Sequence, residues 1–112
     1  MSANTGLPNG VVVVSPPEGS PCPPKTLGLW RHYNCGGEAY GIGAGHPVDL
    51  KLLPLPNGGS MHKNVSSWVN NTDSNAKLIS KNGTLTRILR AGDKLEEPKE
   101  HNDTVERVEW EL

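Results

Sequence analysis

Glycine and proline divide this chain into segments too short for regular helices. The 112 residues include 13 glycines and 10 prolines. Both are unfavourable inside a helix, glycine because of its backbone entropy and proline because it lacks an N–H donor. Short apolar runs bounded by turn residues lie between them, which is typical of strands. Because a chain of this length forms one domain rather than two, the sequence predicts a single all-β domain.

The strand pattern occurs twice along the chain. In the first half we expect strands at 27–30, 38–42, 48–52 and 65–69, and in the second half at 76–80, 84–89 and 105–110. Asn82-Gly83 predicts a two-residue type I′ hairpin, and Ala91-Gly92 in the second half matches Ala44-Gly45 in the first. Two diverged copies of this kind favour two Greek-key units packed as a β-sandwich.

Residues 1–25 differ in composition from the rest and are predicted to form an extended N-terminal arm, with the sandwich domain at 26–112. Six of the prolines fall in this arm, and it holds few core-forming side chains. Its one run with strong β-propensity is made of four valines, Val11, Val12, Val13 and Val14. We predict that these valines bind a partner. A strand on an arm pairs either with another chain's sheet edge or with an edge of its own domain.

Tryptophan and cysteine supply the main candidates for the core. Since the chain has no phenylalanine, we expect Trp30, Trp68 and Trp110 to be buried and to organise the core. Cys22 and Cys35 are predicted to lie near each other, because the arm enters just before the first strand and Cys35 lies in the turn after it. The pair either forms one disulfide or remains as two free thiols.

The spacing around the first tryptophan resembles the Greek-key signature of the βγ-crystallin superfamily, particularly its small bacterial members. That signature is an aromatic residue, four residues, a second aromatic residue, one residue and a glycine. Trp30 and Gly37 fit it, with Cys35 in the second aromatic position. The second hallmark is two Asn or Asp residues, two variable residues, then Ser or Thr and Ser. The chain meets it in the serines, Ser66 and Ser67, and has His62 and Lys63 in the two leading positions. Cys22 has the spacing seen in secreted members, which carry a further cysteine where this chain has Gly28.

The resemblance also implies two loops that bind calcium in many relatives. Here they fall on residues 62–67 and 102–107, where Lys63 and Arg107 place cations at positions that would hold oxygen ligands. Calcium takes six to eight oxygens. We therefore expect no cofactor and no metal, and any calcium site would be a hybrid that draws on Ser66, Asn102 and Asp103.

No catalytic pattern stands out, so we predict that the protein is not an enzyme. No strained-turn motif surrounds a serine, and the four histidines show no metal-ligand spacing. The net charge of −1 argues against nucleic acid as a partner, and no apolar run is long enough to span a bilayer. The eight acidic residues of 92–112 are predicted to form a solvated face.

Two binding functions remain. The first is a small accessory protein of a larger assembly, such as a virion decoration, minor capsid or tail protein. It would be made in the cytoplasm without a signal peptide and would dock through the arm onto a protein partner or repeating lattice. The second, which the resemblance implies, is a secreted peptidase inhibitor that presents a convex loop, for which Pro54 to Ser60 is the candidate.

Overall fold

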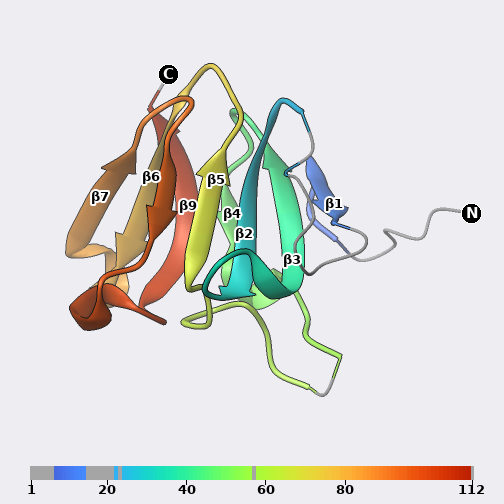
Figure 1. The fold of residues 1–112 in the computed structure, drawn as a ribbon, viewed down its shortest axis with the longest axis vertical. Coiled ribbons are helices and arrows are strands. Elements are labelled where there is room, and N and C mark those ends of the chain that lie inside the picture. Colours follow the sequence, from blue (N-terminus) through green and yellow to red (C-terminus); the bar gives the residue numbers. More distant parts are fainter. Residues whose placement is uncertain (1–6, 15–21, 23, 57, 112) are drawn as a thin grey trace, which may run out of the picture.

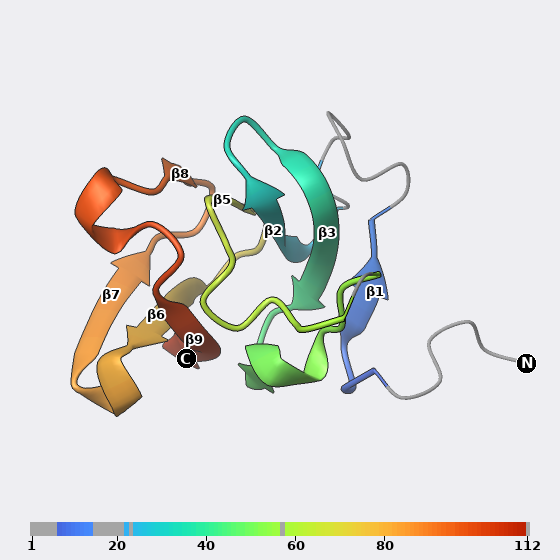
Figure 2. The same cartoon turned by 90° about the horizontal axis from the view of Figure 1, so that it is seen from below.

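The computed structural model describes residues 7–14, 22, 24–56 and 58–111, which form two antiparallel sheets (Figures 1 and 2). The first sheet has the order β1-β3-β2-β5-β8 and contains β1 (Val11–Val13), β2 (Thr26–His32), β3 (Gly36–Gly43), β5 (Ser67–Asn70) and β8 (Lys94–Glu96). The second has the order β4-β9-β6-β7 and contains β4 (Val48–Asp49), β6 (Asn75–Ser80), β7 (Leu85–Leu89) and β9 (Val105–Glu111). Three short 3₁₀ turns complete the described elements, η1 (Leu50–Leu52), η2 (Lys81–Gly83) and η3 (Lys99–His101).

The two Greek-key units exchange their third strands. Unit 1 consists of β2 to β5, and its β4 pairs with β9 in the second sheet. Unit 2 consists of β6 to β9, and its β8 pairs with β5 in the first sheet. Each unit thus completes the sheet of the other. The prediction of two Greek keys packed as a β-sandwich is confirmed.

The main core lies between the sheets and follows the alternation of the strands. Leu27 and Leu29 of β2 point into it and are fully buried, as are Trp68 of β5 and Val108 of β9. Trp110 retains only 8% of its surface exposed. Each large side chain removed from water in this way stabilises the fold by about 1.5–3 kcal/mol.

Trp30 is buried in a second, smaller cluster on the opposite face of the first sheet. Because side chains alternate along β2, Trp30 points to the opposite face of the sheet from Leu29, outside the main core. The Trp30 side chain is still 0% exposed. It packs with Val14 and Ala39, while Cys22, Cys35 and Val69 pack against this group. The segment before β2 therefore contributes to a small core outside the sandwich.

Two glycines make room for that cluster. Gly28 of β2 and Gly41 of β3 are paired in register. A Cβ built on Gly28 would come within 2.6 Å of the Trp30 ring and 2.8 Å of Cys22 Sγ. A Cβ on Gly41 would meet Thr26 Oγ1 at 3.1 Å. A side chain at position 28 would compete with the Trp30 ring for the same space, and one at position 41 would crowd Thr26 and Val12.

The valine segment is a strand of the domain, which corrects the predicted boundary at residue 25. β1 pairs antiparallel with β3, Val11 opposite Ile42 and Val13 opposite Tyr40. Val11 and Val14 are 4% and 3% exposed, so they pack inside this chain and are not available to a partner. Val12 and Val13 remain exposed. The physical reason is that the free edge of β3 offers unpaired backbone groups that β1 satisfies. The predictions for residues 1–6 and 15–21 lie outside the described residues.

Two other local predictions are wrong. The strand expected at 48–52 ends at Asp49, because the Asp49 side chain accepts a hydrogen bond from Lys51 N at 2.9 Å and starts a 3₁₀ turn. Leu52 is consequently 54% exposed. The hairpin at Asn82-Gly83 is longer than two residues, since the last pair is Ser80 with Leu85 and three consecutive residues are left-handed.

Candidate functional site

A hairpin loop formed by residues 54–60 stands away from the sandwich at the bottom of Figure 1. It belongs to the connection between β4 and β5, and the structure describes all of it except residue 57. Its base is closed where Met61 N donates to Leu53 O at 2.9 Å. Leu53 and Met61 are both 0% exposed, so the 54–60 loop is anchored in the main core.

Backbone hydrogen bonds continue from the base toward the tip. Pro54 and Ser60 form an isolated antiparallel β-bridge. Leu55 N donates to Gly59 O at 3.2 Å, and Gly58 N donates to Leu55 O at 3.1 Å. Gly58 and Gly59 both have positive φ, 94° and 81°, a conformation that glycine adopts without a steric penalty. The loop is therefore a closed turn held by its own backbone.

Side chains from the sandwich hold the loop in position. The Tyr40 hydroxyl donates to Pro54 O at 2.6 Å. Burial raises the pKa of Tyr40, and the negative charge of Glu38 raises it further, so the phenol remains a donor at neutral pH. Leu55 is 7% exposed and packs into the core, whereas Pro56 is exposed. The loop is thus fixed by the buried Leu55 side chain, while Pro56 is open to solvent.

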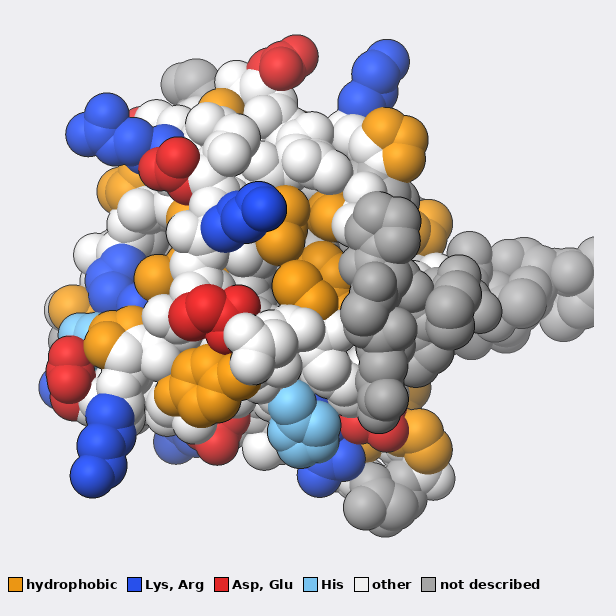
Figure 3. All heavy atoms as spheres, viewed as in Figure 1, with side chains coloured by type: hydrophobic (Ala, Val, Ile, Leu, Met, Phe, Trp, Pro, Cys, Tyr) orange, Lys and Arg blue, Asp and Glu red, His pale blue; other side chains and the backbone are white. Residues whose placement is uncertain are grey.

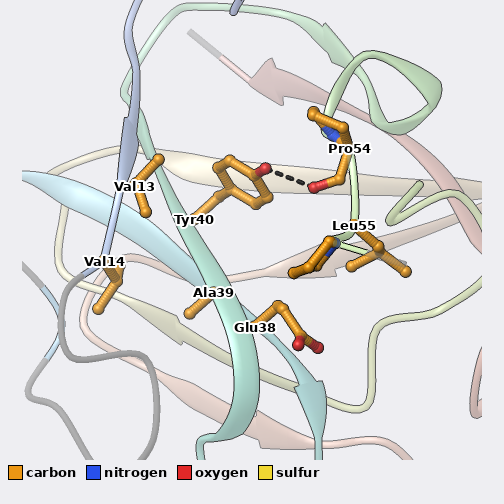
Figure 4. A pocket seen from close by; sticks show the side chains of 8 residues that line it. Val13, Val14, Glu38, Ala39, Tyr40, Pro54 and Leu55 are labelled. Atoms are coloured by element: carbon orange, nitrogen blue, oxygen red, sulfur yellow. Dashed lines mark hydrogen bonds between the residues drawn. The ribbon is translucent and has the colours of Figure 1, made fainter. Parts of the chain in front are cut away.

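An apolar groove of about 370 Å³ separates the loop from β1 (Figure 4). Its described walls come from three segments: Val13 and Val14, then Glu38, Ala39 and Tyr40, then Pro54, Leu55 and Pro56. Figure 4 shows Tyr40 reaching across from β3 to the Pro54 carbonyl. Among the described residues of the lining, Glu38 carries the charge, and its Oε1 lies 3.2 Å from Arg31 Nη1.

Charged side chains are dispersed over the face shown in Figure 3. Lysine, arginine, aspartate and glutamate alternate over the described part of that face rather than gathering by sign. Binding to phosphate backbones relies on a concentrated basic surface. The described part of this face therefore shows no concentrated basic surface, and the absence of a nucleic-acid partner stays a prediction.

The two cysteines approach the same cluster, and both are free thiols. The structure shows them unbonded, and the choice between one disulfide and two free thiols stays a prediction. Burial raises the pKa of Cys22. Burial also raises the pKa of Cys35, with smaller contributions from the charges of Glu96 and Cys22, and against the lowering effects of Lys94 and Ser67. Because the thiolate is the reactive form, both are poor nucleophiles at neutral pH.

The two loops that the resemblance singles out lie side by side. Lys63 N donates to Val105 O at 2.9 Å, and Asp103 N donates to Val65 O at 3.3 Å. Lys63 and Asp103 have nearly the same left-handed φ, 59° and 60°. These equivalent bonds relate the two units by an approximate two-fold symmetry.

Ser66, Asn102 and Asp103 are brought together at one cavity of about 320 Å³. Ser66 Oγ lies 3.4 Å from Asp103 Oδ1, and Asn102 Oδ1 is buried without a hydrogen-bond partner among the described residues. The side-chain oxygens of these three residues are fewer than the six to eight oxygen ligands that a calcium ion takes. Nearby, Lys63 Nζ lies 3.9 Å from Glu106 Oε2. Among the described residues, no group of three or more histidine, cysteine or acidic side chains is placed so that it could hold a metal ion, and metal binding stays a question for experiment.

Sequence reasoning missed the buried carboxylate of Glu97. Its side chain is 0% exposed and forms a two-pronged ion pair with Arg87, with N···O distances of 2.7 and 2.9 Å. Trp68 Nε1 donates to Glu97 Oε2 at 2.9 Å, and the Tyr33 hydroxyl donates to Glu97 O at 2.9 Å. Glu97 is therefore not part of a solvated face. A signal existed, because a buried tryptophan needs an acceptor for its indole N–H.

The comparison with known families bears directly on this geometry. The model of peptidase inhibitor family I36 matches residues 15–84, more than half of the chain. This chain belongs to peptidase inhibitor family I36. The region of the I36 match contains all of unit 1, and with it the 54–60 loop.

A solved structure supports the architecture of this I36 protein. The structure, described as "Evolution of the eye lens beta-gamma-crystallin domain fold", is similar with a TM-score of 0.68. The match is 16% identical and covers 91% of this chain and 97% of that one. At this identity the likeness shows the fold alone, and it confirms the βγ-crystallin-like sandwich. No curated protein matches the sequence.

These comparisons support one of the two predicted functions. Membership of family I36 agrees with the predicted resemblance and favours the inhibitor. Neither comparison supports a virion accessory protein. Within the described residues, no helix has the length and apolar character needed to cross a membrane.

Proposed function

We propose that this I36 protein is a non-enzymatic inhibitor that inserts the 54–60 loop into the active-site cleft of a peptidase. The observation that carries the proposal is the shape of this loop. It projects from the sandwich within the region that matches the inhibitor family, and its base is fixed by buried Leu53 and Met61.

Rigidity is what makes such a loop an effective inhibitor. Ordering a flexible segment on binding costs about 0.5–1.5 kcal/mol for each immobilised side chain. The described residues of the 54–60 loop are already held by backbone bonds and by the Tyr40 hydroxyl. Peptidase complexes with inhibitors typically form between surfaces that change little on binding. Little of the binding free energy gained by the loop would therefore be lost to ordering it.

The site of action follows from the proposed target. An inhibitor acts where its peptidase is found, and family I36 favours a secreted protein that acts outside the cell. The two cysteines are partly buried and their pKa values are raised by that burial, so only a small fraction of either thiol is in the reactive thiolate form at neutral pH.

An inhibition assay against a panel of metallopeptidases and serine peptidases tests the proposal. We expect inhibition of at least one enzyme by the native protein and its loss in Pro56→Asp, which places a charge on the exposed part of the loop. Pro98→Asp is the matched control. Pro98 is also exposed and lies in the corresponding connection of unit 2.

The controls separate the alternatives. Inhibition lost in Pro98→Asp and retained in Pro56→Asp would move the inhibitory surface to unit 2. Absence of inhibition across the whole panel would contradict the proposal. Stable attachment to a repeating protein lattice, in place of inhibition, would restore the assembly hypothesis.

A further inference from the structure

We infer that the outer edge of β7 binds an extended acidic peptide segment of a partner protein, which joins the second sheet as an additional strand. The inference does not depend on the proposed function. β7 ends the order β4-β9-β6-β7, and Figures 1 and 2 show it at the end of the sandwich opposite to β1. The whole of this edge lies within the described residues 58–111.

The four edge strands of the two sheets differ in how well they are protected against pairing with another chain. Edge strands are usually very short, or carry prolines, bulges or exposed charges. β4 has two residues and β1 has three. β8 also has three, two of which are the exposed Lys94 and Glu96. β7 has five residues, contains no proline, and pairs with β6 without a register shift. Of the edges that the structure describes, β7 is therefore the least protected.

The charge on β7 itself does not protect this edge. A charged side chain that points inward discourages pairing, but Arg87 is neutralised by the buried Glu97, with N···O distances of 2.7 and 2.9 Å. Its neighbours Thr86 and Ile88 are exposed, and Ile88 leaves 44% of its surface in water. In an antiparallel ladder every second residue directs its N–H and C=O away from the partner strand. A strand added to β7 would bond to these groups and cover Ile88.

The charges around this edge favour an acidic partner. Residues 74–92, which form β6, η2 and β7, include four basic residues and no acidic one. Arg87 is already neutralised, and Lys77 lies opposite a glutamate of β9 in the register. Lys81, in the turn before β7, and Arg90, directly after β7, are exposed and form no ion pair with another described residue. A strand with an acidic residue at each end would meet a cation at both.

The same charges disfavour a second copy of this chain as the occupant. Two β7 strands paired antiparallel about a two-fold axis would place Arg90 of one copy at the same end of the pair as Lys81 of the other. Like charges that face each other across strands are destabilising. An acidic segment gains at both ends instead, and it can run in either direction because a cation flanks β7 on each side.

The first test titrates the native protein with a capped heptapeptide probe, Glu-Thr-Val-Thr-Val-Thr-Glu. Seven extended residues span about 23 Å and the five residues of β7 about 17 Å, so the probe carries a carboxylate beyond each end of the strand. We expect chemical-shift changes confined to the amides of β7 and its flanking turns, with slower hydrogen exchange there. The same peptide with lysine in place of both glutamates should bind about tenfold more weakly. A version methylated at all five central nitrogens cannot donate to β7 and should not bind.

Charge reversal in the protein provides the second test. In Lys81→Glu/Arg90→Glu the preference should invert, so that the lysine-ended peptide binds better than the glutamate-ended one. Lys25→Glu/Lys51→Glu is the matched control, because both lysines are exposed and lie outside unit 2, and Lys25 has φ of 60°, close to the 53° of Lys81. This variant should keep the native preference. Thermal melting checks that both variants are folded.

Four results would overturn the inference. The first is a lack of binding by the glutamate-ended peptide at millimolar concentration, and the second is binding that maps away from β7. The third is equal binding of the two peptides by the native protein. The fourth is a native dimer in sedimentation velocity that is lost in Ile88→Glu, since a second copy would then occupy this edge. Peptidase inhibition is a separate readout, because the 54–60 loop belongs to unit 1.

Discussion

The same connection of the Greek key has two different forms in the two units. Residues 50–66 join β4 to β5 in unit 1, whereas residues 97–104 join β8 to β9 in unit 2, a connection about half as long. The first projects as the 54–60 loop and is held mainly by its own backbone. The second is fixed to the sandwich by Glu97. One connection thus stabilises the fold, and the other is available to bind.

The two units remain alike where they must fit together. Lys63 and Asp103 occupy equivalent positions, share a left-handed conformation and make equivalent bonds across the contact between the loops. A change in the left-handed backbone of one loop would leave a backbone carbonyl of the other unit without its hydrogen-bond donor. The two units differ instead in the exposed 54–60 loop of unit 1, which makes no such bonds to unit 2.

The largest expected effect concerns the anchored connection of unit 2. Arg87→Ala leaves the Glu97 carboxylate buried without its ion partner, so we expect a loss of about 3–5 kcal/mol in the free energy of unfolding. Urea denaturation measures it. The exposed Arg90→Ala is the control and should change stability by less than about 0.5 kcal/mol. Equal effects of the two variants would show that Glu97 does not hold this connection.

The next prediction concerns β1, the fifth strand of the first sheet. The double variant Val11→Ala/Val14→Ala removes two buried side chains and should cost about 3–5 kcal/mol. Val12→Ala/Val13→Ala changes the exposed neighbours in the same segment and should cost less than about 1 kcal/mol. Melting curves compare the two. The opposite ranking would indicate that these valines serve a partner rather than the fold.

Equivalent hairpin glycines give a smaller difference between the units. Gly83→Ala should cost about 1–2 kcal/mol, because φ is 90° there and a new Cβ would make only an ordinary contact with Arg107. Gly37→Ala has similar strain, with φ of 77°, and its Cβ would also displace the His32 ring, 2.5 Å away. We expect about 1 kcal/mol more for Gly37→Ala. Urea midpoints that rank the two in reverse order would contradict the tighter packing of unit 1.

The cysteines of the smaller cluster predict a modest effect of pH. Burial raises the pKa of Cys22, so the folded state favours the neutral thiol. The stability that this provides is complete below the unfolded pKa, near 9.0, and is lost as the pH rises through the higher folded value. The melting temperature of the native protein should therefore fall more steeply above this pH than that of Cys22→Ala. Parallel curves would show that Cys22 is not buried.

Calcium is expected to have the smallest effect. The cavity at Ser66, Asn102 and Asp103 offers few oxygens, and we predict that millimolar calcium leaves the melting temperature unchanged. Magnesium at the same concentration controls for ionic strength. A rise with calcium alone, abolished in Asp103→Asn, would establish the hybrid site.

Much of the architecture was determined by the sequence alone. Glycine and proline limited the elements to short strands, the repeat predicted two Greek keys, and Trp30, Trp68 and Trp110 marked buried positions. These features are local, because strand alternation and turn chemistry depend on neighbouring residues. The inhibitor alternative also came from sequence, through spacing that the family match supports.

Only the tertiary structure decided where the segments meet. Pairing of β1 with β3, the ion pair of Arg87 with Glu97, and the bonds from Tyr40 to the 54–60 loop all join residues distant in the sequence. From sequence alone, the valine run could pair with a sheet edge of its own domain or of another chain. A glutamate in an acidic segment could equally be buried in an ion pair or exposed to solvent. Which outcome holds depends on the unpaired backbone edges and buried donors that the rest of the fold leaves to be satisfied, and local sequence does not contain that information.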